Sequence, residues 1–174
     1  MGMADQIMYG EETTPGTGVA ATIAIPHVSG GLEYGREPLV SNAMIPGHSI
    51  ISTDQRNGGP ITVSGTIVHE LSTGGVDLLL KHMFGSQTNT GVGPYTHVYK
   101  PTVGTIDGKA LTIQEGITSI DGGQTAVTFN AAGCKITEWS INCNAGEIAD
   151  LNLSIVGHTI ITGETLGTVS LTAA

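Results

Sequence analysis

Six histidines and two cysteines are the residues of this sequence best suited to bind a transition metal. A structural zinc site needs four such ligands, and sequences that form one usually place two of them within a few positions of each other. Here none of the histidines is at ligand spacing from a cysteine or from another histidine; they are His27, His48, His69, His82, His97 and His158. The sequence therefore predicts no metal site, and nothing in it indicates a cofactor.

Two catalytic or cofactor-binding motifs match in sequence but lack the structural context that each requires. His69-Glu70 ends an expected strand and lacks the helix that a HExxH-type zinc site requires. Residues 16–21, Gly-Thr-Gly-Val-Ala-Ala, match the glycine pattern of dinucleotide-binding loops, but a proline-containing turn precedes them and no βαβ pattern surrounds them. No nucleophile elbow or phosphate-binding loop is present. Because catalytic triads assemble in space and not in sequence, an enzyme is kept as the third alternative, without positive support.

Cys134 and Cys143 lie nine positions apart on one expected strand. At about 3.3 Å per residue they would be about 30 Å apart, whereas the Cα atoms of a disulfide lie within about 7 Å. We expect two buried free thiols and assembly in a reducing compartment. Residues 1–5 lack the basic start of a signal peptide, and no apolar run approaches the roughly 20 residues that span a bilayer, so no membrane insertion is expected.

The chain carries 15 acidic and 6 basic residues, a net charge of −9. Proteins that grip nucleic acid neutralise phosphates with clustered Lys and Arg, so this balance argues against such a grip. It is compatible with an acidic wall that repels a passing polyanion. The alternative is that the acidity contributes to solubility and to nothing else.

The element most able to position functional side chains is a long hairpin at residues 133–157. Its second strand alternates between apolar residues, Ala149, Leu151, Leu153 and Ile155, and polar ones, Asp150, Asn152 and Ser154. Successive side chains of a strand point to opposite faces, so this pattern predicts one dry and one wet face.

The first strand of the hairpin alternates with a slip. Cys134 and Ile136 share one phase, whereas Trp139, Ile141 and Cys143 share the other. One extra residue at Thr137–Glu138 reconciles the two phases, as a β-bulge does. Residues 144–147, Asn-Ala-Gly-Glu, form the turn, and Trp139 is expected in the core.

By length, residues 1–174 form a single domain. Eight or nine strands are expected; outside the hairpin they are Val19–Ile25, Leu32–Val40, Ile61–Glu70, Tyr95–Lys100, Lys109–Gln114, Thr125–Asn130 and Leu166–Leu171. Residues 9–17, 47–57 and 86–94 read as turns or loops. Helical spacing of apolar residues predicts one short helix at about 76–84, ended by Gly85. The fold class is mainly β, a β-sandwich or barrel-like sheet with one flanking helix and long extended arms.

Several stretches in order resemble the phage tail tube (major tail) proteins of long-tailed phages. They are residues 9–14 (Tyr-Gly-Glu-Glu-Thr-Thr), 32–39, 65 with 74–85, 109–116, 133–136 and 146–157. The resemblance implies a β-sandwich subunit that joins five other copies in a ring, with sheets forming an inner β-barrel and rings stacked into a virion tail tube. It also implies tape measure, tail terminator and baseplate proteins as partners, and passage of genomic DNA without specific binding. Assembly would take place in the host cytoplasm.

Within that resemblance, residues 1–59 are expected to contribute an N-terminal arm and an inter-subunit loop. Scarce aromatic residues, 4% of the chain, fit a subunit that completes its burial with partner copies. The candidate lumen-lining residues are the wet face of the hairpin: Ser140, Asn142, Asp150, Asn152 and Ser154. An ordinary solvated sheet face is the alternative for each of them. Alternatives for the whole chain are a secretion-needle-type tube protein and a monomeric ligand- or carbohydrate-binding β-sandwich.

Overall fold

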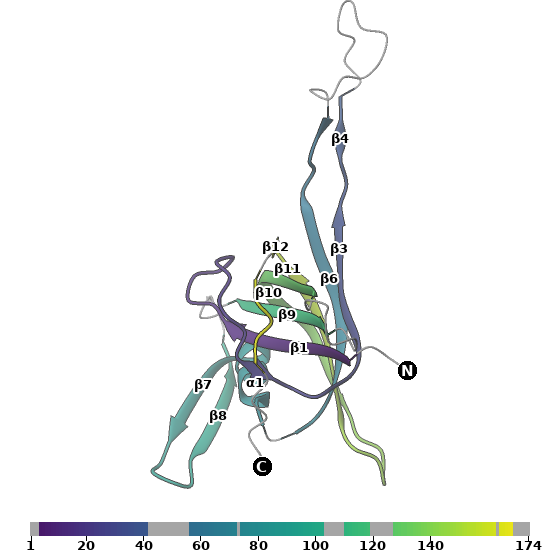
Figure 1. The fold of residues 1–174 in the computed structure, drawn as a ribbon. Coiled ribbons are helices and arrows are strands. Elements are labelled where there is room, and N and C mark those ends of the chain that lie inside the picture. The colour runs from purple at the N-terminus through teal and green to yellow at the C-terminus, as the bar shows by residue number, and fades with distance from the viewer. Residues whose placement is uncertain are drawn as a thin grey trace, which may run out of the picture.

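Strands dominate the computed structural model, which describes residues 4–41, 56–72, 74–102, 110–118, 127–162 and 164–168. The strands are β1 (Ala4–Glu11), β2 (Ile23–Ala24), β3 (His27–Arg36), β4 (Leu39–Val40), β5 (Arg56–Asn57), β6 (Ile61–Glu70), β7 (Gly85–Thr90), β8 (Thr96–Pro101), β9 (Leu111–Thr118), β10 (Val127–Asn142), β11 (Asp150–Gly157) and β12 (Thr159–Ile161). The main sheet has the antiparallel order β2-β1-β9-β10-β11-β6-β3, and β12 also pairs with β10 (Figure 1). This is the mainly β architecture that the alternation predicted.

The long strand β10 joins the two layers of the fold. Its first half, up to Cys134, pairs with β9, and its second half, from Lys135, pairs with β11. Register shifts fall between Ala131 and Cys134 and between Ile136 and Glu138, and Gly133 has a φ of +69°. Such bulges bend and twist a strand, which lets β10 pass from one layer to the other. The shift at Ile136/Glu138 confirms the predicted bulge.

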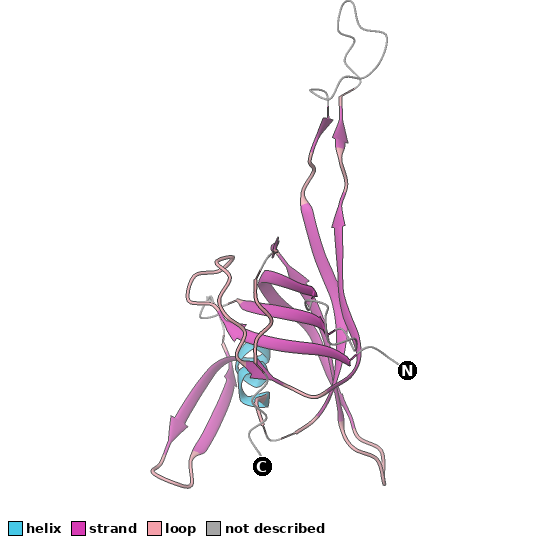
Figure 2. Cartoon of the chain, in the orientation of Figure 1, coloured by secondary structure: helices cyan, strands magenta, loops and turns pink. Residues whose placement is uncertain are grey.

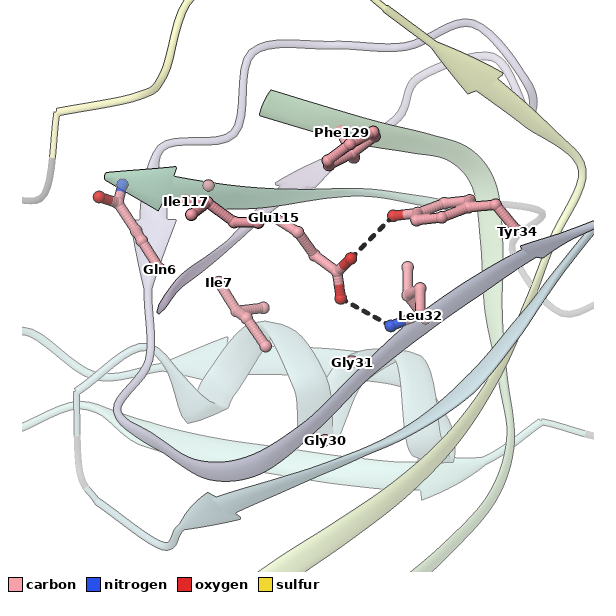
Figure 3. A pocket seen from close by; sticks show the side chains of 10 residues that line it. Gln6, Ile7, Gly30, Gly31, Leu32, Tyr34, Glu115, Ile117 and Phe129 are labelled. Atoms are coloured by element: carbon pink, nitrogen blue, oxygen red, sulfur yellow. Dashed lines mark hydrogen bonds between the residues drawn. The ribbon is translucent and has the colours of Figure 1, made fainter. Parts of the chain in front are cut away.

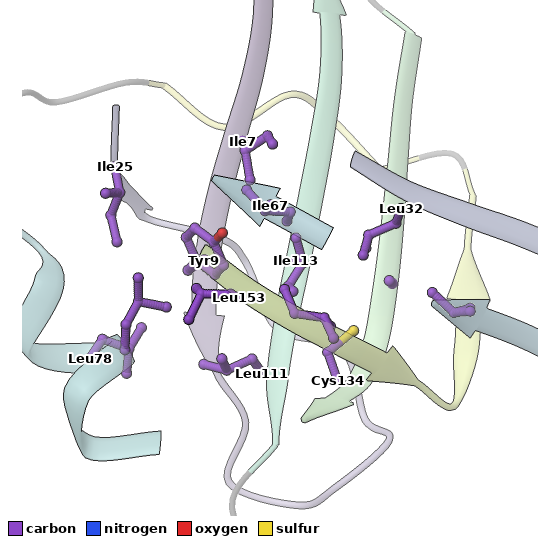
Figure 4. Close-up of a cluster of buried hydrophobic side chains, with 14 of the residues drawn as sticks. Ile7, Tyr9, Ile25, Leu32, Ile67, Leu78, Leu111, Ile113, Cys134 and Leu153 are labelled. Atoms are coloured by element: carbon purple, nitrogen blue, oxygen red, sulfur yellow. The ribbon is translucent and has the colours of Figure 1, made fainter. Parts of the chain in front are cut away.

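The core lies between the β1–β9–β10 layer and the β3–β6–β11 layer (Figure 4). A polar contact crosses it: the Tyr9 hydroxyl lies 2.6 Å from His69 Nε2, and His69 Nδ1 lies 3.0 Å from the Pro26 carbonyl oxygen. A neutral imidazole satisfies both contacts if Nδ1–H donates to Pro26 and Nε2 accepts from Tyr9. Burial lowers the pKa of His69, which favours this neutral form.

A second buried polar group, the Glu12 carboxylate, ties the segment after β1 to the bend of β10. Its Oε1 accepts hydrogen bonds from the Thr112 hydroxyl and the Gly133 N–H, both at 2.8 Å, and its Oε2 accepts one from the Gly16 N–H at 2.7 Å. Glu12 is fully buried. A buried charge is tolerated when its oxygens are satisfied in this way, and charge-assisted bonds are the stronger class.

The helix α1 (Val76–Phe84) packs beneath the strands (Figure 2). It ends as predicted at Gly85, whose φ of +89° suits glycine and whose N–H donates to the Lys81 carbonyl. Leu78 and Leu79 are its buried residues, whereas Leu80 is half-buried. Lys81 Nζ donates to Glu11 Oε1 at 2.7 Å, which links the helix to the end of β1.

Two ribbons project from the body (Figure 1). One continues the β3–β6 pair outward into β4–β5. The other is the β7–β8 hairpin, held to α1 at its base by the Tyr99 hydroxyl, which donates to Asp77 Oδ1 at 2.6 Å. Burial and this bond raise the pKa of Tyr99 to about 12.

Several sequence expectations were wrong in detail. The structure has twelve strands in its described residues, more than the eight or nine expected. Residues 86–90, expected in a loop, are strand β7; both faces of this strand are polar, so no hydrophobic alternation marks it. Tyr9, expected in a turn, is buried in strand β1, which lies between β2 and β9 in the sheet.

Several expected strands have different limits. Of Val19–Ile25 only Ile23–Ala24 is a strand, and the strand expected at Lys109–Gln114 runs from Leu111 to Thr118. The strand expected at Leu32–Val40 is divided between β3, which begins earlier and ends at Arg36, and β4. The strand expected at Thr125–Asn130 is, from Val127 on, the beginning of β10. Residues 166–168 are not a strand, because side chains take the backbone groups of Gly167: its N–H donates to Gln114 Oε1 at 2.7 Å, and its carbonyl oxygen accepts from Gln6 Nε2 at 2.9 Å. Residues 47–55 and 169–171 lie outside the described residues.

Candidate functional site

The five predicted lining residues lie together on one face of the antiparallel sheet β3-β6-β11-β10. Asn142 is directly opposite Asp150, Ser140 is opposite Asn152, and Glu138 is opposite Ser154. Residues directly opposite each other in a sheet share a face, with Cβ atoms about 5 Å apart. Ser140 and Asn142 are exposed, and the three residues of β11 are half-buried. The hairpin therefore presents the wet face that its alternation predicted.

Three further acids share this face, and their sequence positions alone did not reveal it. Glu70 of β6 is opposite Asp150, and Glu138 of β10 is one of the cross-strand partners of Ser154. Glu33 of β3 lies in the same cross-strand row as Lys135, the one basic residue among the described residues of these paired rows. We call the face with these four acids and the predicted Ser and Asn residues the acidic face. The alternation of residues 61–70 was a signal for Glu70, but the pairing of β6 with β11 is a tertiary fact.

The position of Glu70 opposite Asp150 is costly for the fold. Like charges directly opposite each other on a sheet destabilise it by roughly the amount that opposite charges stabilise it. Within the described part of the chain, no basic side chain forms an ion pair with either residue. Such a pair is expected where the surface serves a purpose other than stability.

The opposite face of the hairpin is apolar and only partly covered. Leu151, Leu153 and Ile155 are buried, but Trp139 is 42% exposed and Ile141 is 44% exposed. The expectation of Trp139 in the core was wrong, because the hairpin extends past the facing β1–β9–β10 layer (Figure 1) and leaves the indole partly exposed. The Phe84 ring packs on the indole at a centroid distance of 5.4 Å. Cys143 is exposed, whereas Cys134 is buried with its thiol pKa raised by burial to about 12. Both thiols are free as predicted, but the expected burial of Cys143 was wrong.

The four-stranded sheet has an open edge on each side. Strand β3 is the last strand of the sheet order, and the second half of β10 pairs only with β11 among the described strands. The Leu32 N–H of β3 donates to Glu115 Oε1 at 2.6 Å, so it points away from β6 and toward the open side. Open strand edges are templates for pairing with another chain.

The described residues contain no group of three or more His, Cys, Asp or Glu side chains arranged to hold a metal ion. Within the same residues, no helix is long and apolar enough to cross a bilayer. The chemistry that the acidic face offers is thus electrostatic: it repels anions and presents small polar groups to water.

A family model for phage tail tube proteins matches residues 4–174. The chain belongs to the phage tail tube protein family. This membership confirms the resemblance seen in the sequence and makes the protein a structural component of a virion. Among curated proteins, none matches the sequence significantly.

Comparison with solved structures finds similar proteins of low sequence identity. The SPP1 tail tube protein has a TM-score of 0.52 at 12% identity, covering 92% of this chain and 78% of that one. A protein from the tail of an empty gene transfer agent particle gives 0.47 at 12% identity, covering 91% and 96%. An Hcp protein gives 0.35 at 16% identity, covering 92% and 98%. The first match supports the tail tube fold independently of the family model.

Proposed function

We propose that this phage tail tube protein assembles with copies of itself into six-membered rings that stack into a tube, with the acidic face turned toward the bore. The role is structural and not catalytic. Tape measure protein inside the tube, and terminator and baseplate proteins at its ends, are the further partners, and assembly takes place in the host cytoplasm before DNA passes through.

The observation that carries this proposal is a sheet with two open edges and one acidic face. The sheet has an even number of strands in antiparallel order, so β3 and the second half of β10 run in opposite directions. Head-to-tail pairing of β3 with β10 of the next copy would therefore continue the antiparallel pattern around a closed ring. Closure removes both edges, which is how barrels solve the edge problem.

The charge of the acidic face suits a bore that DNA must traverse. The acidic face of each copy carries four acids and one lysine, and every subunit of a ring repeats this set. Phosphates facing such a wall find few cations to pair with, so DNA does not adhere. The projecting β4–β5 and β7–β8 ribbons are placed to contact neighbouring copies, because an isolated two-stranded ribbon is only marginally stable in water.

Thiol labelling of assembled tubes tests which face lines the bore. In a Cys143→Ser background, Asn152→Cys places a thiol on the acidic face, and Thr13→Cys places one on the exposed loop after β1 as the matched control. A small maleimide reaches both sites in tubes, whereas a bulky polyethylene glycol maleimide is expected to label only the Thr13→Cys variant. Equal labelling of Asn152→Cys by the bulky reagent in intact tubes would place the acidic face outside.

A further inference from the structure

A cavity of about 270 Å³ opens beside the free edge of β3, between this strand and the β1–β9–β10 layer (Figure 3). Its walls include Ile7, Ile117 and Phe129 from that layer and Leu32 and Tyr34 from β3. The Tyr34 ring stacks on Phe129 at a centroid distance of 5.9 Å. Pockets that bind small molecules usually have volumes of about 300–1,000 Å³, so the size of this cavity suits one large side chain better than a free ligand.

One polar group points into this cavity. The Glu115 carboxylate accepts a hydrogen bond from the Leu32 N–H at 2.6 Å and another from the Tyr34 hydroxyl at 3.0 Å (Figure 3). Ile7 and Phe129 are the direct cross-strand neighbours of Glu115 on β1 and β10. The cavity thus combines apolar walls with a carboxylate acceptor, next to backbone groups of an open strand edge.

We propose that this cavity receives the Trp139 side chain of a neighbouring copy of the chain. The inference rests on the proposed ring and adds to it the contact that fixes one subunit against the next. Trp139 is the single tryptophan of the sequence, and it lies on the half of β10 that forms the opposite open edge.

The register places Trp139 on the required side of the sheet. Trp139 pairs with Leu153, which pairs with Ile67, which pairs with Gly30 of β3. All four therefore belong to one cross-strand row on the core side of the sheet. Pairing β10 of the next copy with β3 continues this row, so without stagger Trp139 meets Gly30 at the rim of the cavity.

A stagger of two residues toward Arg36, which keeps faces matched, moves Trp139 opposite Leu32, another cavity residue. Gly30 has no side chain, so a large side chain of the next strand can pack over it. Placing an aromatic residue across from an edge glycine is a known way to stabilise strand pairing. Both registers therefore deliver the indole to the same cavity.

The chemistry of the two partners matches. An indole is a large apolar group with one N–H donor and no acceptor, and the cavity is apolar with one carboxylate acceptor. When a neighbouring strand pairs with β3, its backbone carbonyl can accept the hydrogen bond that the Leu32 N–H now donates to Glu115. The carboxylate can then accept a hydrogen bond from the indole N–H and still accept the one from the Tyr34 hydroxyl.

The fluorescence of the wild-type protein tests the proposal, because all tryptophan emission comes from Trp139. Free subunits and assembled tubes are compared for emission maximum and for quenching by acrylamide, with tube formation followed by electron microscopy. We expect a blue shift and a several-fold lower quenching constant in tubes. Tubes whose Trp139 stays as quenchable as in free subunits overturn this inference and leave the ring intact. If no tubes or rings form, the proposed function fails first and this inference with it.

Two matched substitutions separate the cavity from any other cover of the indole. Ile117→Gln removes an apolar cavity wall, and Val127→Gln removes the exposed apolar side chain directly opposite it on β10, outside the cavity. For Ile117→Gln we expect an about tenfold higher subunit concentration for assembly, the factor that corresponds to about 1.4 kcal/mol, and restored quenching. Val127→Gln should assemble as the wild type does. If Ile117→Gln, with subunits as thermally stable as the wild type, assembles normally and keeps Trp139 protected, another surface covers the indole and the proposal is wrong.

Discussion

Asp150→Asn is the substitution that best separates a bore-lining role from a structural one. Asp150 lies directly opposite Glu70, and like charges at such positions cost about 0.2–1 kcal/mol. The amide has nearly the same shape and removes the repulsion. Asp150 is half-buried and the Glu70 side chain is exposed, so we take about 0.5 kcal/mol for the gain. In a domain of this size 1 kcal/mol shifts Tm by about 2–4 °C, so the subunit should melt about 1–2 °C higher.

The same substitution should harm function. Each subunit loses one negative charge from the acidic face, every copy in the ring repeats the loss, and Asp150→Lys doubles the change and adds a cation that pairs with phosphates. Tubes of both variants should form normally. The rate of DNA ejection should decrease from phage with the wild-type protein to phage with Asp150→Asn and further to phage with Asp150→Lys. Added salt should reduce the differences, because screening acts over about 10 Å at 0.1 M ionic strength.

The assays are thermal melting by circular dichroism, electron microscopy of tubes and time-resolved DNA release. Glu33→Gln is the control for stability, because Ser64 and not an acid lies opposite Glu33, so no gain in Tm is expected. Normal ejection by phage carrying Asp150→Lys in intact tubes would refute the placement of the acidic face in the bore. An unchanged or lower Tm for Asp150→Asn would refute the repulsion argument alone.

Three further predictions concern the subunit. Glu12→Gln should lower the free energy of unfolding in urea by about 3 kcal/mol, because the new amide nitrogen is a donor and would face a donor from which the buried carboxylate now accepts a hydrogen bond. A loss under about 1 kcal/mol would contradict the role of Glu12 in tying β1 to β10. Since burial lowers the pKa of His69 below the 6.5 of an unfolded histidine, stability is retained above about pH 6.5 and falls as the pH decreases below it. His69→Gln should flatten that slope below about pH 6.5, and an unchanged slope assigns it to other groups. Maleimide at neutral pH should modify exposed Cys143 and spare buried Cys134 in the folded subunit, which mass spectrometry of peptides checks; equal modification would contradict the burial of Cys134.

Elements with strong local patterns were predictable. The alternation of residues 149–155 indicated β11 and its two faces, and the phase slip at Thr137–Glu138 indicated the bulge that the register confirms. The helix was predictable because apolar spacing and the glycine after it act within a few residues of each other. In each case the signal and the structure are local.

The errors arose where the environment, and not the local pattern, decides the outcome. Alternation placed Trp139 on the apolar side of its strand, but it could not show that the facing β1–β9–β10 layer ends before it covers this residue. Cys143 is exposed for the same reason, because it lies still farther along the strand. Strand β7 has no hydrophobic period because neither face of its ribbon is buried, so its residues looked like a loop.

The sequence by itself determined a β-rich, acidic subunit, the wet face of the β10–β11 hairpin, the short helix and, through the resemblance, the family. Only the tertiary structure decided which distant residues meet: Glu70 opposite Asp150, Glu12 beneath the bend of β10, and a cavity at one open edge with an exposed tryptophan at the other. The physical reason is that side-chain phase follows from backbone geometry over a few residues, whereas strand pairing and burial depend on contacts between segments tens of residues apart.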